Sequence, residues 1–369
     1  MFTSTFLSDH PFLFIFLFYF ILFLGFVFYL KLKASLEKET TTKKTVEELE
    51  KILINACLIG NVKGVKEVLQ NSEININCED DPSWKRTPFH VACEKGRIEI
   101  VKLLLKDKRV DVNKQNEDNW TPLGHACYNG HIEIVKLLLN HKRVDVNKPK
   151  VGATPLYLTC WSGYTEIVKL LLKDKRVDVN RVNYDGQTPF YIACKWNSIE
   201  IVKLLLKDKR IEVNQINNNE ATPFSVACQE GRIEVVKLLL NDERVNINEV
   251  DKDHRTPFYM ACFNGRTEIV KLLLNDKRVD VNKSMKYGWT PLYIVCSNRY
   301  IEIVKLLVSN KRIDIHKIAK EGQTVIDIIR EREGILKKGY WKEMIELLES
   351  RVGKFSFPLF SKKKLKFFF

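Results

Sequence analysis

The stretch NEDNWTPLGHACYNGHIEIVKLLLNHKRVDVN, from Asn116 to Asn147, decides the fold. Thr121-Pro122 predicts the start of a short helix, because proline at the first helical position loses no hydrogen bond. Gly130 is suited to end that helix, since glycine tolerates a positive φ. Apolar residues then recur at helical spacing from Ile132 to Leu139, which predicts a second helix with one apolar face. The unit therefore reads as helix, turn, helix and extended loop.

The same unit recurs along the chain at a nearly constant interval. Successive Thr-Pro pairs are 34, 33, 34, 34, 34 and 34 residues apart, and they begin at Thr87, Thr121, Thr154, Thr188, Thr222, Thr256 and Thr290. A repeat of this length cannot bury its own apolar face, so neighbouring units must stack into a solenoid. Such a chain typically offers a long surface to another macromolecule.

The repeated pattern resembles the ankyrin repeat. Thr-Pro-Leu/Phe-x-x-Ala-Cys-x-x-Gly is followed by Glu-Ile-Val-Lys-Leu-Leu-Leu and Asp-Val-Asn, and degenerate units at Glu47–Asn77 and Thr324–Leu348 flank the regular ones. The resemblance implies an all-α ankyrin-repeat solenoid of about nine units over residues 46–350. Two departures stand out. The segment Lys106–Val110 and its equivalents lack the usual Gly-Ala, and Asn197 and Arg299 replace the glycine between the helices. We expect strain at Arg299, because only glycine and asparagine accept a left-handed backbone readily.

An apolar segment precedes the repeats. Residues 12–30 contain no charged side chain, and as a helix they would be about 28 Å long, close to the thickness of a bilayer core. We expect a single-pass transmembrane helix, followed by a basic linker over residues 31–45. The lysines after the span and their absence before it place the N-terminus outside or in a lumen and the repeats in the cytosol. The alternative is a cleaved signal and a secreted or soluble effector.

Eight of the nine cysteines occupy one position of the repeat. One thiol per stacked unit suits neither a disulfide nor a zinc site, so we expect free, buried cysteines in a reducing compartment. No phosphate-binding loop, nucleophile elbow or clustered metal-ligand motif occurs in the sequence. We therefore expect no enzyme activity, no cofactor, no metal and no catalytic residue.

Aromatic residues gather at the variable positions of the repeat. In ankyrin proteins the loop tips and the end of the first helix form a concave groove that holds protein partners, and exposed aromatic residues are common anchors of such interfaces. The competing interpretation is that these rings pack against neighbouring loops. The candidate partner-binding residues are Trp84, Trp120, Tyr128, Trp161, Tyr184, Trp196, Phe263, Tyr287 and Trp289.

The net charge of +14 is concentrated at the ends of the chain. Residues 31–45 hold five lysines against two glutamates, and residues 351–369 form a basic and aromatic tail without an acidic residue. Lys-Arg pairs recur after the second helices, and such a stripe could bind nucleic acid or anionic lipid. Neighbouring Glu and Asp residues compensate it, so we expect no nucleic-acid partner. The expected protein is a monomeric scaffold that binds a protein partner and tethers it to a membrane.

Overall fold

The computed structural model describes residues 27, 31, 44–318, 322–336 and 340–352. Within them lie nine pairs of antiparallel helices, which we number as units 1 to 9 in chain order. The pairs are α2 (Val46–Ile59) with α3 (Val62–Leu69), α4 (Pro88–Glu94) with α5 (Ile98–Lys106), α6 (Pro122–Tyr128) with α7 (Ile132–Leu139), α8 (Pro155–Ser162) with α9 (Thr165–Lys173), α10 (Pro189–Lys195) with α11 (Ile199–Lys207), α12 (Pro223–Glu230) with α13 (Ile233–Leu240), α14 (Pro257–Phe263) with α15 (Thr267–Asn275), α16 (Pro291–Ser297) with α17 (Ile301–Ser309), and α18 (Val325–Leu336) with α19 (Tyr340–Val352).

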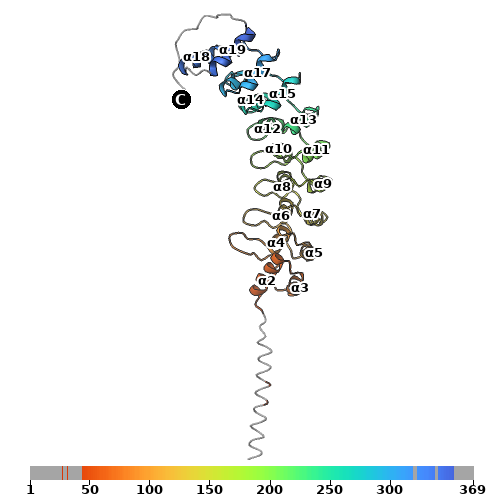
Figure 1. Cartoon of the computed structure of the whole chain (residues 1–369). Helices are drawn as coiled ribbons and strands as arrows, with labels where there is room; N and C mark the ends of the chain where they lie inside the picture. Colours follow the sequence, from red (N-terminus) through yellow and green to blue (C-terminus); the bar gives the residue numbers. More distant parts are fainter. Residues whose placement is uncertain (1–26, 28–30, 32–43, 319–321, 337–339, 353–369) are drawn as a thin grey trace, which may run out of the picture.

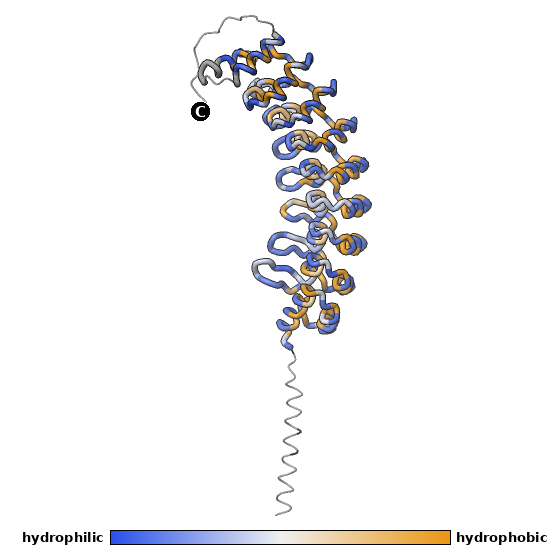
Figure 2. Tube along the Cα trace, in the orientation of Figure 1, coloured by the Kyte–Doolittle hydropathy of each residue, from blue (hydrophilic) through white to orange (hydrophobic). Residues whose placement is uncertain are grey.

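The units stack in a single row, and each contacts its neighbours along the chain. First helices pack on first helices and second helices on second helices, so the rod has two layers. Figure 1 shows that the connecting loops project on the side of the first helices and that the stack bends toward this side. In Figure 2 the apolar segments concentrate within the helical layers, whereas the projecting loops are largely hydrophilic. The loop side and the first helices therefore form one continuous inner face.

The Thr-Pro pairs begin the first helices, as the sequence predicts. In unit 5 the Thr188 hydroxyl accepts a hydrogen bond from the Tyr191 backbone N–H at 3.0 Å, and Pro189 takes the first helical position. This arrangement satisfies one of the backbone donors left free at a helix start. After the C-terminal ends of the first helices α10 and α16, Asn197 and Arg299 have φ of 60° and 62°. Both adopt the left-handed conformation that glycine has at this position in other units. Arg299 thus carries the expected strain.

The core is a continuous column of small and branched apolar residues. In unit 3, Ile134, Val135 and Leu138 of the second helix are fully buried. Cys127 of the first helix is also fully buried, and all nine cysteines are free and buried, as predicted. Burial raises the pKa of the Cys127 thiol to about 12. These thiols are protonated at neutral pH and fill space as small apolar groups.

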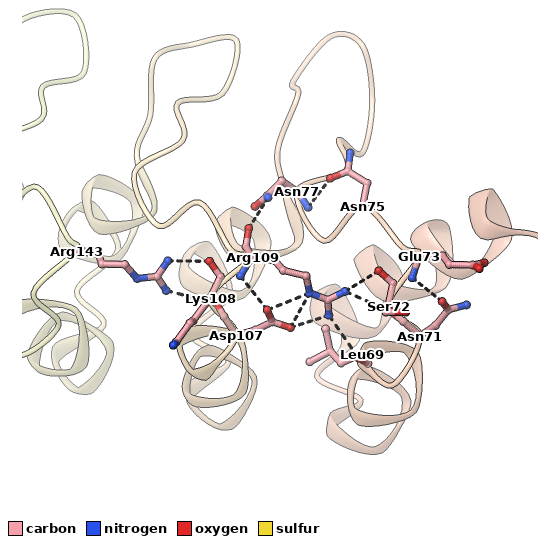
Figure 3. A network of polar contacts seen from close by, with 10 residues as sticks. All are labelled: Leu69, Asn71, Ser72, Glu73, Asn75, Asn77, Asp107, Lys108, Arg109 and Arg143. Carbon is pink, nitrogen blue, oxygen red and sulfur yellow. Dashed lines mark hydrogen bonds and ion pairs between the residues drawn. The ribbon is translucent and has the colours of Figure 1, made fainter.

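Arginine side chains join each second helix to the unit before it. Figure 3 shows Arg109, whose guanidinium donates to the backbone carbonyls of Ser72 and Leu69 at the end of unit 1. The same guanidinium is held by the Asp107 carboxylate at 2.7 Å. Equivalent arginines donate to carbonyls of the preceding unit, and we call the set the arginine clamps: Arg109, Arg143, Arg176, Arg210, Arg244, Arg278 and Arg312.

These arginine clamps explain the loops that lack glycine. A helix end leaves four backbone carbonyls without a partner, and glycine in a left-handed conformation often helps to satisfy them. Here the guanidinium of the next unit does so: Arg210 donates to the Leu172 carbonyl at 2.9 Å. In the last unit, Arg351 of α19 donates to the Val308 carbonyl at 3.0 Å, which gives α17 the same type of cap. The arginines of the basic pairs are therefore structural.

A ladder of asparagine side chains runs beside the arginine clamps. The Asn180 amide donates to the Arg210 carbonyl at 2.7 Å, and its oxygen accepts from the Glu212 N–H at 3.0 Å. The side chain of each such asparagine thus satisfies one backbone carbonyl and one backbone N–H of the next unit. The ladder comprises Asn77, Asn113, Asn147, Asn180, Asn214, Asn248 and Asn282.

Two segments singled out in the sequence fall outside the described residues. The apolar segment 12–30 does so except for Val27, and the tail does so beyond Val352. Among the residues that the structure describes, no helix combines the length and the hydropathy needed to cross a bilayer.

Replacing an arginine clamp should destabilise the solenoid. Arg210→Ala removes hydrogen bonds to Asp208 and to the Leu172 carbonyl, so we expect the free energy of unfolding to fall by about 1–3 kcal/mol. Chemical denaturation measures this change. Lys209→Ala is the matched control, because Lys209 is the exposed neighbour in the same basic pair, and it should change stability by less than about 0.5 kcal/mol. Equal effects of the two changes would contradict the structural role of Arg210.

The clamps should also make stability depend on pH in the acid range. Hydrogen bonds from the arginine side chains lower the pKa of Asp174, Asp208 and Asp276 below the ordinary value of 3.8. When folding lowers the pKa of a carboxyl group, the stability that this group contributes is complete above its pKa in the unfolded state. It is lost as the pH falls through its pKa in the folded state. We expect the melting temperature to fall between about pH 5 and pH 3, and less steeply when all three are changed to Asn. Parallel pH profiles would argue against this linkage.

Candidate protein-binding face

The predicted aromatic residues lie on the inner face, at the ends of first helices and at loop tips. Eight of the nine are exposed, and Tyr184 is the most exposed at 74%. Trp120 is the exception, because its ring is half-buried. The exposed residues are Trp84, Tyr128, Trp161, Tyr184, Trp196, Phe263, Tyr287 and Trp289. The structure brings some of them together into two clusters and leaves Trp84, Tyr184, Trp196 and Phe263 outside those clusters; the Phe263 ring stacks on Tyr259 of its own helix at 6.4 Å.

The first cluster joins units 3 and 4. The Trp120 ring contacts the Tyr128 ring edge-on at a centroid distance of 5.2 Å, and Tyr128 lies 6.0 Å from Trp161. Tyr128 and Trp161 hold equivalent positions at the ends of α6 and α8. We call Trp120, Tyr128 and Trp161 the aromatic run. Its rings cross a unit boundary, so together they present a larger apolar surface than one repeat can offer.

The Trp120 ring is held by a stacking contact and a cation–π contact. One face of its ring stacks on His125 at 4.7 Å, and the Lys150 ammonium lies 3.9 Å from the ring centroid. Stacking and cation–π contacts of this type each contribute about 0.5–1.5 kcal/mol. The interpretation that loop-tip tryptophans pack locally therefore applies to Trp120, which positions the more exposed Tyr128 and Trp161 beside it.

Two buried histidines hold the backbone and the ring of Trp120. The Thr87 N–H donates to Nδ1 of His90, so the proton of the neutral ring is on Nε2, which donates to the Trp120 carbonyl at 3.0 Å. Burial lowers the pKa of His90 to about 4 and that of His125 to about 3. Both imidazoles are therefore neutral at physiological pH, and the loop that carries Trp120 is held without a buried charge.

Lys150 was not among the residues singled out from the sequence. It lies in a two-residue turn in which Val151 has φ of 47° and Gly152 has φ of 80°, closed by paired backbone hydrogen bonds between Lys150 and Ala153 at 2.8 Å. A positive φ is costly for a β-branched residue such as valine. The signal in the sequence was the single 33-residue step, from Thr121 to Thr154, which shortens this loop and brings Lys150 over Trp120.

A second aromatic cluster lies in unit 8, near the other end of the rod. Trp289 lies 6.5 Å from Tyr287 and 5.2 Å from Tyr293, and the Met285 N–H donates to the Trp289 carbonyl at 3.0 Å. Units 5 to 7 separate it from the aromatic run. The inner face thus has two aromatic centres, which suits a long partner better than a small molecule.

The arginines of the basic pairs are engaged within the solenoid, so the exposed lysines of these pairs, such as Lys209, are the charges that face an alternative partner. These arginines bind carbonyls of the preceding unit, as described above. The lysines within the second helices are paired with the glutamate three residues earlier, as in Lys203 with Glu200 at 2.7 Å. The described residues also contain no group of three or more His, Cys, Asp or Glu side chains placed to hold a metal ion.

Stacked helix pairs with loops on one side define a repeat solenoid of the kind that binds other proteins. Family models of ankyrin repeats match residues 108–183, 175–251 and 225–319, and a further ankyrin model matches residues 69–126. The chain belongs to the ankyrin repeat family. Ankyrin repeats are interaction modules that in general carry no catalytic activity, in agreement with the resemblance seen in the sequence.

Curated relatives match over short stretches. A 26S proteasome non-ATPase regulatory subunit 10 from Dictyostelium discoideum is 30% identical over 71 residues, which are 19% of this chain and 30% of that protein. An ankyrin repeat-containing protein from Schizosaccharomyces pombe is 37% identical over 59 residues, 16% of this chain and 24% of its own length. The chain thus spans less than a third of either relative, a length equivalent to about two repeats.

Removing Trp120 should cost stability, whereas removing an exposed ring should not. Trp120→Ala loses the stack on His125 and the contact with Lys150, so we expect a loss of about 1–3 kcal/mol in the free energy of unfolding. Tyr184→Ala is the control at an exposed loop tip and should cost less than about 0.5 kcal/mol. Denaturation of both variants tests the difference. A Trp120→Ala protein as stable as the wild type would contradict the packing role of this ring.

Proposed function

We propose that this protein is a non-enzymatic scaffold that binds a protein partner on its inner face and holds it at the cytosolic side of a membrane. The aromatic run is the observation that carries the first part. Tyr128 and Trp161 remain exposed although they lie beside a well-packed Trp120. Exposed aromatic rings on a rigid support lose little side-chain entropy on binding and are common centres of protein interfaces.

The electrostatics of the inner face favour a protein partner over a polyanion. The charged groups near the aromatic run are of both signs, as in the network in which Arg86 contacts Asp80 at 2.7 Å and Glu94 at 2.9 Å. Lys95 pairs with the same Glu94 at 2.7 Å. A partner for such a face needs apolar anchors and a mixed polar rim, which is the usual composition of a protein interface.

The membrane part of the proposal rests on the sequence. Residues 12–30 form an uncharged apolar segment of bilayer length, and the lysines that follow it favour a cytosolic position for the repeats. A cleaved signal would instead release the repeats as a secreted or soluble effector. These two alternatives differ in a measurable property, which is the presence of residues 12–30 in the mature protein.

The test is affinity capture with the full chain, tagged at its C-terminus and expressed in cells. The binding variant changes Tyr128, Trp161 and Trp289 to Ala, and it spares Trp120 because that ring supports the fold. The matched control changes three exposed lysines of the basic pairs, Lys108, Lys175 and Lys209, to Ala. We expect the aromatic variant to capture at least tenfold less of the proteins that bind the wild type, and the lysine variant to capture the same amount as the wild type.

Capture that is lost in the lysine variant and retained in the aromatic variant would reject the inner face as the binding site and favour the basic stripe. Equal capture by all three proteins would also reject it. The same cells test the anchor, because the full chain should resist alkaline extraction from membranes and a chain lacking residues 1–30 should not. A mature chain found without residues 12–30 would overturn the tether while leaving partner binding open to the capture experiment.

A further inference from the structure

A long side chain covers the turn between the two helices at most unit boundaries. It comes from the next unit and reaches back to the end of the first helix. Arg97 donates to the Leu58 carbonyl at 2.8 Å, Arg232 to the Lys195 carbonyl at 2.9 Å, and Arg266 to the Gln229 carbonyl at 2.9 Å. His131 and the rings of Tyr164 and Tyr300 hold the same position at other boundaries. We call these side chains the turn covers.

Unit 5 has no such cover. Its residue at this position is Ser198, which directly precedes α11. A side-chain carbon built on Gly163 of unit 4 would meet nothing within 4 Å, whereas one built on Gly130 would lie 2.5 Å from the Tyr164 ring. A serine side chain ends one bond beyond its Cβ and cannot reach back as an arginine does. Among the described residues, none takes the place of the cover at Gly163.

The missing cover leaves a hollow at the boundary of units 4 and 5. It has a volume of about 550 Å³ and lies over the starts of α9 and α11, with α13 on its far side. Gly163 and Ser198 line it together with Ile199, Leu238, Glu200 and Glu234. The hollow therefore combines apolar surface with two carboxylates, and Lys203 is the only cationic residue in its lining.

The neighbouring units indicate what would fill this hollow. At three other boundaries the cover is an arginine, and Arg232 and Arg266 bind the carbonyl 37 residues before them. Counting back by the same interval from Ser198 gives the carbonyl of Trp161. The guanidinium offers five donors on an apolar stem, which suits a backbone carbonyl of the preceding helix end together with the apolar and carboxylate groups of the lining.

We propose that the hollow between units 4 and 5 binds an arginine side chain of a protein partner. The guanidinium takes the place of the missing cover and donates to the Trp161 carbonyl, while the aliphatic stem lies over Gly163 and Ile199. Glu200 and Glu234 are each paired with one lysine, Lys203 at 2.7 Å and Lys237 at 2.6 Å, and their carboxylates can also accept hydrogen bonds from the guanidinium. The site is formed by the helix turns and second helices, and it shares with the aromatic run only the backbone of Trp161, whose ring is not part of the lining.

The test uses the full chain in detergent micelles and N-acetyl-arginine amide as the probe, with ligand-observed NMR as the readout. For a ligand of this size we expect a Kd on the order of 1 mM. Ser198→Arg should weaken binding at least tenfold, because the protein would then supply its own cover. The variant should remain folded, since arginine occupies the same position in units 2, 6 and 7, and its melting temperature should equal or exceed that of the wild type.

Three controls make the outcome decisive. N-acetyl-citrulline amide has the same shape without the charge and should bind at least tenfold more weakly. Arg232→Ser opens an equivalent hollow at the next boundary and should raise the number of bound probes from one to two per chain. Changing Tyr128 and Trp289 to Ala should leave the affinity unchanged, which separates this site from the proposed inner face.

Several results would overturn the proposal. These are saturable binding that persists in Ser198→Arg, equal affinity for the citrulline probe, and no saturable binding of the arginine probe in the wild type. Tighter binding of N-acetyl-tyrosine amide would also overturn it, because Tyr164 and Tyr300 show that an aromatic ring can serve as a turn cover.

Discussion

The structure depends on the contact between an arginine side chain and the backbone carbonyls of the preceding unit. A solenoid has no contacts between distant units, so its order is transmitted only through nearest neighbours. Apolar packing alone would let helices of similar shape slide along one another. Each arginine clamp fixes the register, because its guanidinium binds the end of one helix while its own carbonyl receives the asparagine of the ladder, as Arg210 does with Leu172 and Asn180.

The inner face inherits its geometry from this register. The loop that carries Trp120 is held by His90 of the preceding unit, so the aromatic run is correctly placed only when two units are docked in the observed relation. Both buried histidines are neutral, which lets them bridge units without the cost of a buried charge. Binding surface and stacking order are thus consequences of the same contacts, and the exposed rings need little rearrangement to receive a partner.

The sequence predicted what is encoded within one unit and missed what is formed between units. Thr188-Pro189 and the glycines mark the helix starts and ends, because capping depends on residues only a few positions apart. The clamp of Arg210 on Leu172 joins residues 38 positions apart, so the Lys-Arg pairs looked like a surface stripe. Trp120 resembled the other loop-tip aromatics for the same reason, since His90, which binds its carbonyl, and Lys150, which lies over its ring, are each 30 residues away in the sequence. Ser198 is informative only by comparison with the equivalent residue of each other unit.

The position of Arg351 has a consequence for how the protein is made. Stabilising contacts reach back by one unit, so each repeat that leaves the ribosome can dock at once on the repeat before it, and synthesis can proceed with little apolar surface waiting for a distant partner. For the last regular unit the cap comes from farther along the chain, because Arg351 of the final helix lies 43 residues after Val308, whereas Arg210 lies 38 residues after Leu172. Completion of that unit therefore coincides with the end of translation of the helical region, and a chain truncated before α19 would present an open end to chaperones and proteases.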